Sequence, residues 1–264
     1  MKMKSVIGHV IGETARGMIS NFLFPRKGIE WGGPFNGQRA RQALFHDIIK
    51  SCRPCAIVET GTYRGNTTEF LANTGLPIYS IEVDQFNYGF ARARLRRRRN
   101  VSLFQGDSRA TLHKLIDGPL RALANDSSLF FYLDAHWNDD LPLAEELELI
   151  FSRCSAAVVM IDDFQVPFDA GYGYDDYGAG KALVPQYIAP LVSVHGLRAF
   201  FPSTPSAGES GACRGCIVLA SHSALVSRLS SLPLLRNNEG QVSVHQAVGS
   251  ASTDARTAAD LATR

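Results

Sequence analysis

The sequence predicts an α/β fold, a doubly wound and mostly parallel seven-stranded sheet that ends in an antiparallel β-hairpin. Short, almost wholly apolar runs alternate with helical stretches along most of the chain, which is the pattern of a parallel sheet covered by helices on both faces. Two further apolar runs follow without a helix between them, and the Ser- and Gly-rich loop that joins them indicates antiparallel pairing.

Five strand–helix units make up the parallel part of the predicted sheet. Their strands are expected at 56–59, 78–83, 102–106, 129–134 and 157–163, followed by helices at 66–74, 86–98, 109–124, 142–152 and 180–194. A helix over 38–50 precedes the first strand, and the hairpin strands are expected at 197–202 and 216–221. Because sheets of this type bind ligands beyond the carboxyl ends of their strands, the turns found there hold the candidate functional residues.

The 264 residues suffice for one domain with short appendages. We expect an N-terminal helical and connector extension over 1–35, a main domain over 36–248 and a disordered tail over 249–264. Apolar residues of the extension recur at close to helical spacing. This segment is expected to pack on the main domain or on a second copy as the arm of a homodimer, and a membrane-surface helix is the alternative.

The composition excludes several classes of protein. Hydrophobic residues at 45% and charged residues at 20% exclude wholesale disorder, and a net charge of +2 argues against a dedicated nucleic-acid-binding protein. Apolar runs are too short for a membrane span. The N-terminus starts basic like a signal peptide, but its apolar stretch is broken by Gly8, His9, Gly12 and Glu13, and no small-residue cleavage site follows. We therefore expect a cytoplasmic protein.

The five cysteines include two pairs with C-x-x-C spacing, Cys52 with Cys55 and Cys213 with Cys216. A shared zinc site is one interpretation of two such pairs. The predicted fold places the pairs at opposite ends of the sheet, so buried thiols are the favoured interpretation, and an odd number of cysteines fits a reducing compartment.

A glycine-rich turn follows the first predicted strand and leads into a helix. It reads ETGTYRGNTT over 59–68, so that Gly61 and Gly65 have the spacing G-x-x-x-G rather than the dinucleotide fingerprint G-x-G-x-x-G. Glycines at such a turn let a ligand approach the backbone and the helix N-terminus. A tight turn without a ligand is the alternative.

Polar residues at the next two strand ends suit an adenosine-containing ligand. Glu82 lies 21 residues beyond Gly61, where a carboxylate can accept hydrogen bonds from both ribose hydroxyls. Asp107 and Ser108 follow the third strand and could accept an adenine amino group, or cap the next helix, or do both.

Four polar side chains, Asp134, His136, Asp162 and Asp163, follow the fourth and fifth strands. Carboxylates that converge on one crevice repel each other unless a cation lies between them. An oxygen-rich set of this kind suits Mg²⁺ or a similar divalent ion. Independent caps of two helices are the alternative.

Taken together, these motifs resemble the class I S-adenosylmethionine-dependent methyltransferases, and most closely the metal-dependent O-methyltransferases of the catechol and macrocin types. The likeness extends over about residues 36–220 and rests on IVETGTYRGNTT, YSIEVD, VSLFQGDS, FYLDAHW and MIDDF, in that order. It implies that the main domain binds S-adenosylmethionine and methylates a hydroxyl group of a small molecule or sugar.

The resemblance also implies roles for individual residues. Asn36, Gly37 and Gln38 match the segment that closes over the cofactor in this family. Glu82 would hold the ribose, and Asp107 with Ser108 the adenine. The other implied cofactor-binding residues are Glu59, Gly61, Thr62, Tyr63, Gly65, Thr67 and Asp134.

Asp134, Asp162 and Asp163 match the metal-ligand positions of the family, with Asp163 standing where the catechol enzymes have Asn. The catalytic lysine of the catechol enzymes has no counterpart, because no lysine occurs between Lys114 and Lys181. The sugar enzymes place an acid–base residue two positions beyond the first metal aspartate, which implies His136 as the general base and a sugar as the preferred acceptor. A histidine that stacks on adenine or caps a helix is the alternative.

Two further segments invite a functional interpretation. The Gly-rich segment 165–180 could form a lid whose Tyr172, Tyr174 and Tyr177 stack on the acceptor, or an ordinary long loop. The arginines of 92–99 are most simply a solvated helix face, and attraction to a phosphorylated acceptor, an acidic glycan or nucleic acid is the alternative.

Three other functions fit parts of the pattern. An NAD-dependent oxidoreductase would share the sheet and an acid about 20 residues beyond the glycine turn. It would not need the three carboxylates, and its fingerprint has a second glycine at G-x-G that this chain lacks. A metal-dependent nucleotide-sugar glycosyltransferase would use Asp162 and Asp163 with a divalent ion to hold a diphosphate. A methyltransferase-like scaffold without activity is the third possibility.

Overall fold

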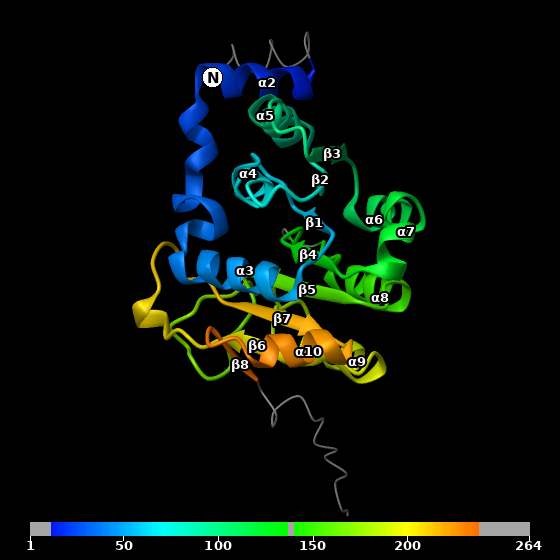
Figure 1. The fold of residues 1–264 in the computed structure, drawn as a ribbon. Helices are drawn as coiled ribbons and strands as arrows, with labels where there is room; N and C mark the ends of the chain where they lie inside the picture. Colours follow the sequence, from blue (N-terminus) through cyan, green and yellow to red (C-terminus); the bar gives the residue numbers. More distant parts are fainter. Residues whose placement is uncertain (1–11, 137–139, 238–264) are drawn as a thin grey trace, which may run out of the picture.

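The computed structural model describes residues 12–136 and 140–237. Their centre is an eight-stranded sheet with the strand order β3-β2-β1-β4-β5-β7-β6-β8 (Figure 1). The strands are β1 (Ala56–Thr60), β2 (Ile78–Glu82), β3 (Val101–Gln105), β4 (Leu129–Leu133), β5 (Ala157–Asp162), β6 (Arg198–Pro202), β7 (Cys216–Ala220) and β8 (Leu235–Asn237).

The predicted mostly parallel sheet with an antiparallel C-terminal part is confirmed. Strands β1 to β5 pair in parallel, whereas β7 is antiparallel to both β5 and β6. The predicted number of seven strands is wrong for the described residues, because β8 extends the sheet beyond β6. Three residues are too few to show a strand periodicity, so the sequence does not reveal this edge strand.

Helices precede or follow the strands at nearly the predicted places. They are α2 (Glu13–Leu23), α3 (Arg39–Cys52), α4 (Asn66–Ala72), α5 (Gln85–Leu95), α6 (Ser108–Asp117), α7 (Pro119–Asp126), α8 (Leu143–Arg153), α9 (Pro185–Val194) and α10 (Ser223–Ser230), with 3₁₀ turns η1 (Pro25–Gly32), η2 (Pro34–Gly37) and η3 (Ser206–Gly208). The single helix expected at 109–124 is two helices, because Gly118 and Pro119 interrupt it. Among the described residues, no helix has both the length and the apolar character needed to cross a bilayer.

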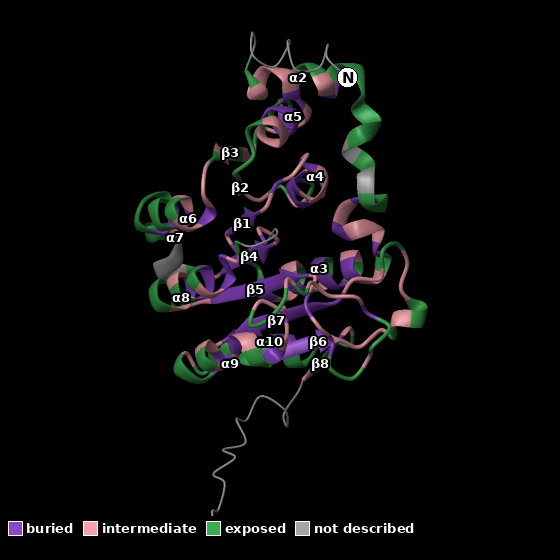
Figure 2. Cartoon of the chain, turned by 180° about the vertical axis from the view of Figure 1, so that it is seen from behind, coloured by how far each residue is buried: buried purple, intermediate pink, exposed green. Residues whose placement is uncertain are grey.

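The hydrophobic core lies on both faces of the sheet. Alternate residues of a strand point to opposite faces, so Val58 packs with residues of α6, α8 and α9, whereas Ile57 packs with residues of α3, α4 and α10. Every residue of β1, β4, β5 and β7 is buried, and Figure 2 shows these strands enclosed in the middle of the molecule. This rigid centre fixes the positions of the residues at the strand ends.

The N-terminal extension packs on the main domain through a close crossing of α2 with α5 (Figure 1). A Cβ atom at Gly17 would lie 2.0 Å from the carbonyl oxygen of Phe86, and one at Gly89 would lie 2.0 Å from that of Thr14. Only glycine therefore lets the two backbones approach this closely. Residues 1–11 and the predicted tail 249–264 lie outside the described residues, and the expected homodimer stays a prediction.

Candidate functional site

The glycine turn after β1 is folded against the neighbouring strand ends. The amides of Gly61 and Thr62 donate hydrogen bonds to the carbonyl oxygen of Ile81, at 3.0 and 3.1 Å. Gly61 has a φ of 86°, and a Cβ atom there would lie 2.1 Å from the carbonyl oxygen of Asp134. Tyr63 also has a left-handed backbone, with a φ of 50°. The turn is thus held tightly, and its residues lie beside the ends of β2 and β4.

Glu82 lies next to this turn at the end of β2. Its carboxylate accepts hydrogen bonds from the amide of Tyr63 at 2.6 Å and from the amide of Asp84 at 2.8 Å. Burial raises the pKa of Glu82 to about 7, although these amides favour the charged form. The structure therefore brings Glu82 and the glycine turn together, as a shared ligand site requires.

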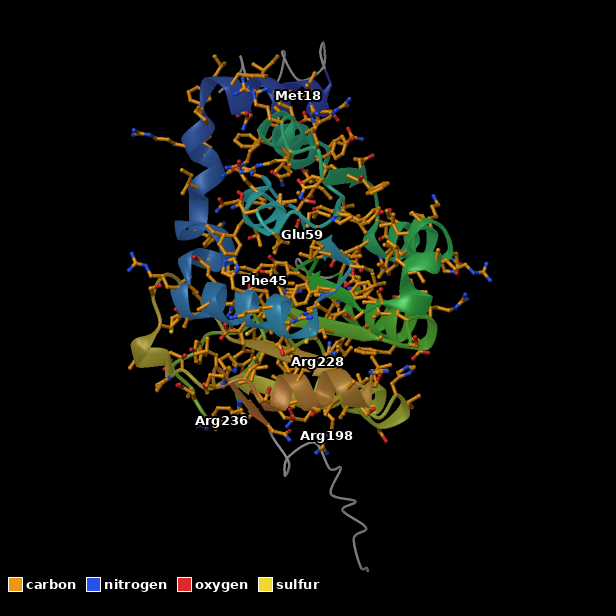
Figure 3. The ribbon with its side chains drawn as sticks, viewed as in Figure 1. Met18, Phe45, Glu59, Arg198, Arg228 and Arg236 are labelled. Atoms are coloured by element: carbon orange, nitrogen blue, oxygen red, sulfur yellow. The ribbon has the colours of Figure 1, made fainter. Side chains whose placement is uncertain are left out.

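Glu59 is buried at the end of β1, in the middle of the molecule (Figure 3). One carboxylate oxygen accepts hydrogen bonds from the hydroxyls of Thr68 and Ser80, both at 2.5 Å, and Ser80 also bonds to the Thr62 hydroxyl. The other oxygen has no partner among the described residues. Burial raises the pKa of Glu59 to about 7. The side chain thus links the turn, α4 and β2, and keeps one free acceptor.

Two more of the predicted residues lie close to the turn. Gly65, with a φ of 76°, is the residue before the first turn of α4. The Thr67 hydroxyl accepts a hydrogen bond from the amide of Phe35 at 3.3 Å. The chain segment around Asn36 therefore lies against the start of α4.

Asp107 and Ser108 stand at the end of β3, as predicted. The Asp107 carboxylate accepts a hydrogen bond from the amide of Ala110 at 3.1 Å and so caps α6. It also bonds to the Arg109 guanidinium at 2.7 Å, and this hydrogen bond lowers its pKa. The capping role is confirmed, while the binding of adenine stays a prediction.

Glu146 on α8 is a buried carboxyl that sequence analysis missed. Its side chain accepts a long hydrogen bond from the Thr60 hydroxyl at 3.4 Å, and one of its oxygens has no partner among the described residues. Burial raises its pKa to about 7. A glutamate in a helix of otherwise amphipathic spacing gives no sign in the sequence that it points inward.

Glu146→Gln is expected to be more stable than the wild type above pH 7. In the unfolded chain this carboxyl ionises near its ordinary pKa of 4.5, whereas the folded chain keeps the proton up to about 7. The stability contributed by this group is therefore complete below pH 4.5 and is lost as the pH rises to about 7. Urea unfolding should show a gain on the order of 3 kcal/mol at about pH 8 and almost none at about pH 4.5. Glu148→Gln on the exposed face of α8 is the control, and an equal gain at both pH values would contradict this assignment.

Asp134, His136 and Asp163 form a compact group at the ends of β4 and β5. One ligand atom from each lies within 4.8 Å of the others. His136 is 4% exposed, and its Nε2 atom has no hydrogen-bond partner among the described residues. This atom lies 3.8 Å from Asp134 Oδ1 and 4.0 Å from Asp175 Oδ2. Burial lowers the pKa of His136, and the charges of Asp163 and Asp175 oppose this effect.

Asp162 is separate from this group. It is 1% exposed and forms an ion pair with Arg41 of α3. Its Oδ2 atom accepts hydrogen bonds from the Tyr132 hydroxyl at 2.5 Å and the Asn36 side-chain amide at 3.4 Å, and its Oδ1 atom accepts one from the amide of Asp163 at 2.9 Å. Both oxygens therefore already have protein partners, and a cation of the protein itself, Arg41, meets the charge of this carboxylate.

Arg214 connects the group of Asp134, His136 and Asp163 to the segment 165–180. Its Nε atom donates to Asp163 Oδ1 at 2.8 Å, and another nitrogen of the guanidinium binds Asp175. The Tyr177 hydroxyl is 2.8 Å from the carbonyl oxygen of His136 and 2.5 Å from Asp175 Oδ2. Tyr172 instead is buried, with its hydroxyl donating to the carbonyl oxygen of Thr204, so it is not available for stacking. Asp175 and Tyr177 of the segment thus lie next to His136.

The two C-x-x-C pairs lie at opposite ends of the sheet, as expected. Cys55 precedes β1 at its amino end, whereas Cys216 pairs with Asp162 at the carboxyl end of β5. All five cysteines are free thiols.

Neither of two cavities among the described residues suits the cofactor. A space of about 10 Å³ beside Arg41 is too small for more than a water molecule. An open depression of about 460 Å³ lies on α6, α8 and α9, away from the strand ends.

Comparison with known proteins places the fold. No family model and no curated protein matches the chain. The structure of the O-methyltransferase from Bacillus cereus in complex with S-adenosylhomocysteine gives a TM-score of 0.50 at 14% identity, over 83% of this chain and 96% of that one. The O-methyltransferase TomG from Streptomyces achromogenes, which is involved in tomaymycin synthesis and was solved with S-adenosylmethionine, gives a TM-score of 0.45 at 14% identity, over 84% and 96%. At 14% identity the likeness to the Bacillus structure concerns the fold alone.

Proposed function

We propose that this protein is an S-adenosylmethionine-dependent O-methyltransferase that acts on a hydroxyl group of a small molecule or sugar. The observation that carries the proposal is the hydrogen bond between Glu82 and the amide of Tyr63, 2.6 Å long. This hydrogen bond joins the turn after β1, in which Gly61 and Tyr63 have left-handed backbone conformations, to Glu82 at the end of β2. Folds of this type bind ligands at this edge of the sheet.

The residues of the turn and the next two strand ends fit the cofactor. Glu82 is 6% exposed and would accept hydrogen bonds from the ribose hydroxyls. Asp107 and Ser108 would bind the adenine, while the free oxygen of Glu59 would accept a hydrogen bond near the methionine end. When bound, the sulfonium supplies an activated methyl group, so the protein has to orient the acceptor oxygen and accept its proton.

A divalent ion such as Mg²⁺ would fit between Asp134 and Asp163. One oxygen of each carboxylate lies within 4.8 Å of the other, and carboxylates are the ligands that Mg²⁺ prefers; the nitrogen of His136 beside them would not bind the ion and would stay open for the proton. When held by Asp134 and Asp163, such an ion would supply positive charge that lowers the pKa of an acceptor hydroxyl. The sequence groups Asp162 with these ligands; we assign it a supporting role instead, because its pairing with Arg41 leaves no oxygen free.

His136 would take the proton from the acceptor hydroxyl. A general base needs an open nitrogen within hydrogen-bond reach of the reacting group, and Nε2 of His136 has no protein partner among the described residues. The hydroxyl of Tyr177 binds the carbonyl oxygen of His136 at 2.8 Å, which fixes the backbone that holds the imidazole. The segment 165–180 would also exclude water from the acceptor.

Calorimetric titration with S-adenosylhomocysteine, with and without Mg²⁺, tests the proposal. We expect saturable binding by the wild type and binding weakened about tenfold or more in Glu82→Gln, because hydrogen bonds to a charged group contribute about 1.5–3 kcal/mol. Asp84→Asn, two residues further along the chain, is the matched control. Binding of NAD or a uridine nucleotide sugar in place of S-adenosylhomocysteine would support the oxidoreductase or the glycosyltransferase, and binding of none would leave the fold as a scaffold.

A further inference from the structure

An exposed apolar patch covers the end of α2 and the 3₁₀ turn η1 that follows it. The large hydrophobic side chains there are between 47% and 65% exposed. Single exposed hydrophobic residues are common on soluble proteins, but a group of them in one place is typical of an interaction site. We call this surface the N-terminal patch; its members are Ile19, Phe22, Leu23, Phe24, Ile29 and Trp31. All six fall within residues 19–31 of the chain.

Positive charge lies directly beside the N-terminal patch. The chain has six arginines and no acidic residue between Gln85 and Arg99. Two of them are used inside the protein, since Arg94 and Arg98 form ion pairs with Glu69 at 2.9 and 3.3 Å. The others, Arg92, Arg96, Arg97 and Arg99, are exposed.

The cations and the patch form one continuous surface. The Arg96 guanidinium lies 5.2 Å from the ring centre of Phe22, and the Lys27 ammonium lies 4.7 Å from that of Phe24. Both views of the fold show α2 and α5 side by side at one end of the molecule (Figures 1 and 2). Apolar side chains flanked by cations are typical of segments that lie in the interface of an anionic bilayer.

We propose that the N-terminal patch docks this protein on the surface of an anionic membrane. A second copy bound through the same patch would bring the two arginine clusters against each other, since a two-fold interface pairs a surface with itself. A single-stranded nucleic acid would use the aromatic rings, but Ile19, Leu23 and Ile29 offer it no stacking surface. A bilayer accommodates aliphatic and aromatic side chains alike and supplies the negative charge. The proposal does not depend on the methyltransferase activity.

The patch is rigidly connected to the rest of the molecule. The glycine crossing fixes α2 on α5, and the Arg64 guanidinium donates to the carbonyl oxygen of Lys27 in η1 at 2.8 Å. Arg64 itself belongs to the turn after β1. Docking would therefore require no unfolding, and it would hold that turn at a fixed distance from the lipid surface.

Co-sedimentation with vesicles tests the proposal. We expect the full-length protein to sediment with phosphatidylcholine vesicles that contain phosphatidylglycerol, and not with phosphatidylcholine alone. Arg96→Ser/Arg97→Ser should weaken the partition about 25-fold, because each cation near an anionic surface contributes about 1 kcal/mol. Phe22→Ser/Leu23→Ser should weaken it at least about tenfold. The matched controls are Arg198→Ser, far from α2 in Figure 3, and Val194→Ser at the end of α9, a helix at the opposite end of the molecule from α2 in Figure 1. Both should sediment like the wild type.

Several outcomes of these experiments would contradict the proposal. They are equal partition onto neutral and anionic vesicles, absence of sedimentation with either, an equal loss in the controls, and tighter binding to a single-stranded oligonucleotide than to vesicles. Light scattering that shows a dimer abolished by Phe22→Ser/Leu23→Ser would assign the patch to a second copy instead. Because Phe22 and Leu23 are 60% and 65% exposed, their substitution should leave the melting temperature unchanged, which separates lost docking from lost folding.

Discussion

Replacing Arg41 by methionine is expected to lower the free energy of unfolding by about 3–5 kcal/mol, because the change leaves a buried carboxylate without its counterion. Arg41 is 3% exposed, and its partner Asp162 is 1% exposed. The guanidinium also donates to the carbonyl oxygen of Arg214. Denaturant unfolding measures the loss, and Arg39→Met, two residues away on the exposed side of α3, is the matched control.

The double variant Arg41→Met/Asp162→Asn decides whether the ion pair is the cause. Removing both charges takes away the unpaired carboxylate, so the double variant should be more stable than the sum of the two single effects predicts, by about 0.5–3 kcal/mol. Additive effects would show that Arg41 acts through packing and the Arg214 carbonyl, and not through Asp162.

His136→Ala is expected to lower kcat for methyl transfer by about 10²–10⁴-fold if His136 is the general base. The imidazole nitrogen lies 3.8 and 4.0 Å from Asp134 and Asp175 and does not reach Glu82 or the turn in any described contact. Binding of S-adenosylhomocysteine should therefore stay within about twofold of the wild type, since the loss concerns only the transition state.

The rate is measured on an acceptor that the wild type methylates, chosen from sugar and catechol hydroxyls. His113→Ala on the exposed face of α6 is the control. A variant with the wild-type rate would show that another group takes the proton.

Removal of divalent ions with a chelator should abolish turnover and leave binding of S-adenosylhomocysteine intact. An unchanged rate would show that Asp134 and Asp163 have a structural role only.

The sequence is a good guide to the sheet because the central strands are buried on both faces. Continuous apolar runs such as AVVMI, 157–161, between helical stretches are typical of buried parallel strands. The strand β8 and the helix α10 escape prediction because both are short: Leu235–Asn237 has three residues and Ser223–Ser230 has eight, too few to show a clear periodicity.

The candidate site could be predicted only where it lies at strand ends. The acids there follow from topology, which places the ends of parallel strands at one edge. The cations that meet them do not: Arg41 comes from a helix before the first strand, and Arg214 comes from the loop before β7. Arg41 and Arg214 are so distant in sequence from the acids that their spacing does not indicate that they converge on them. The sequence therefore suggests a metal ion as the partner of Asp162, whereas in the structure Asp162 forms an ion pair with Arg41.

The long reach of Arg41 has a consequence for the nascent chain. Its side chain binds the carbonyl oxygen of Arg214, 173 residues later in the sequence. At synthesis rates of about 5–20 residues per second, the ribosome releases Arg214 on the order of ten seconds or more after Arg41. During that interval the apolar face of α3 can already pack on β1 and α4, but Arg41 lacks the Arg214 carbonyl oxygen, and a truncated chain that stops before β7 would leave this arginine without that partner.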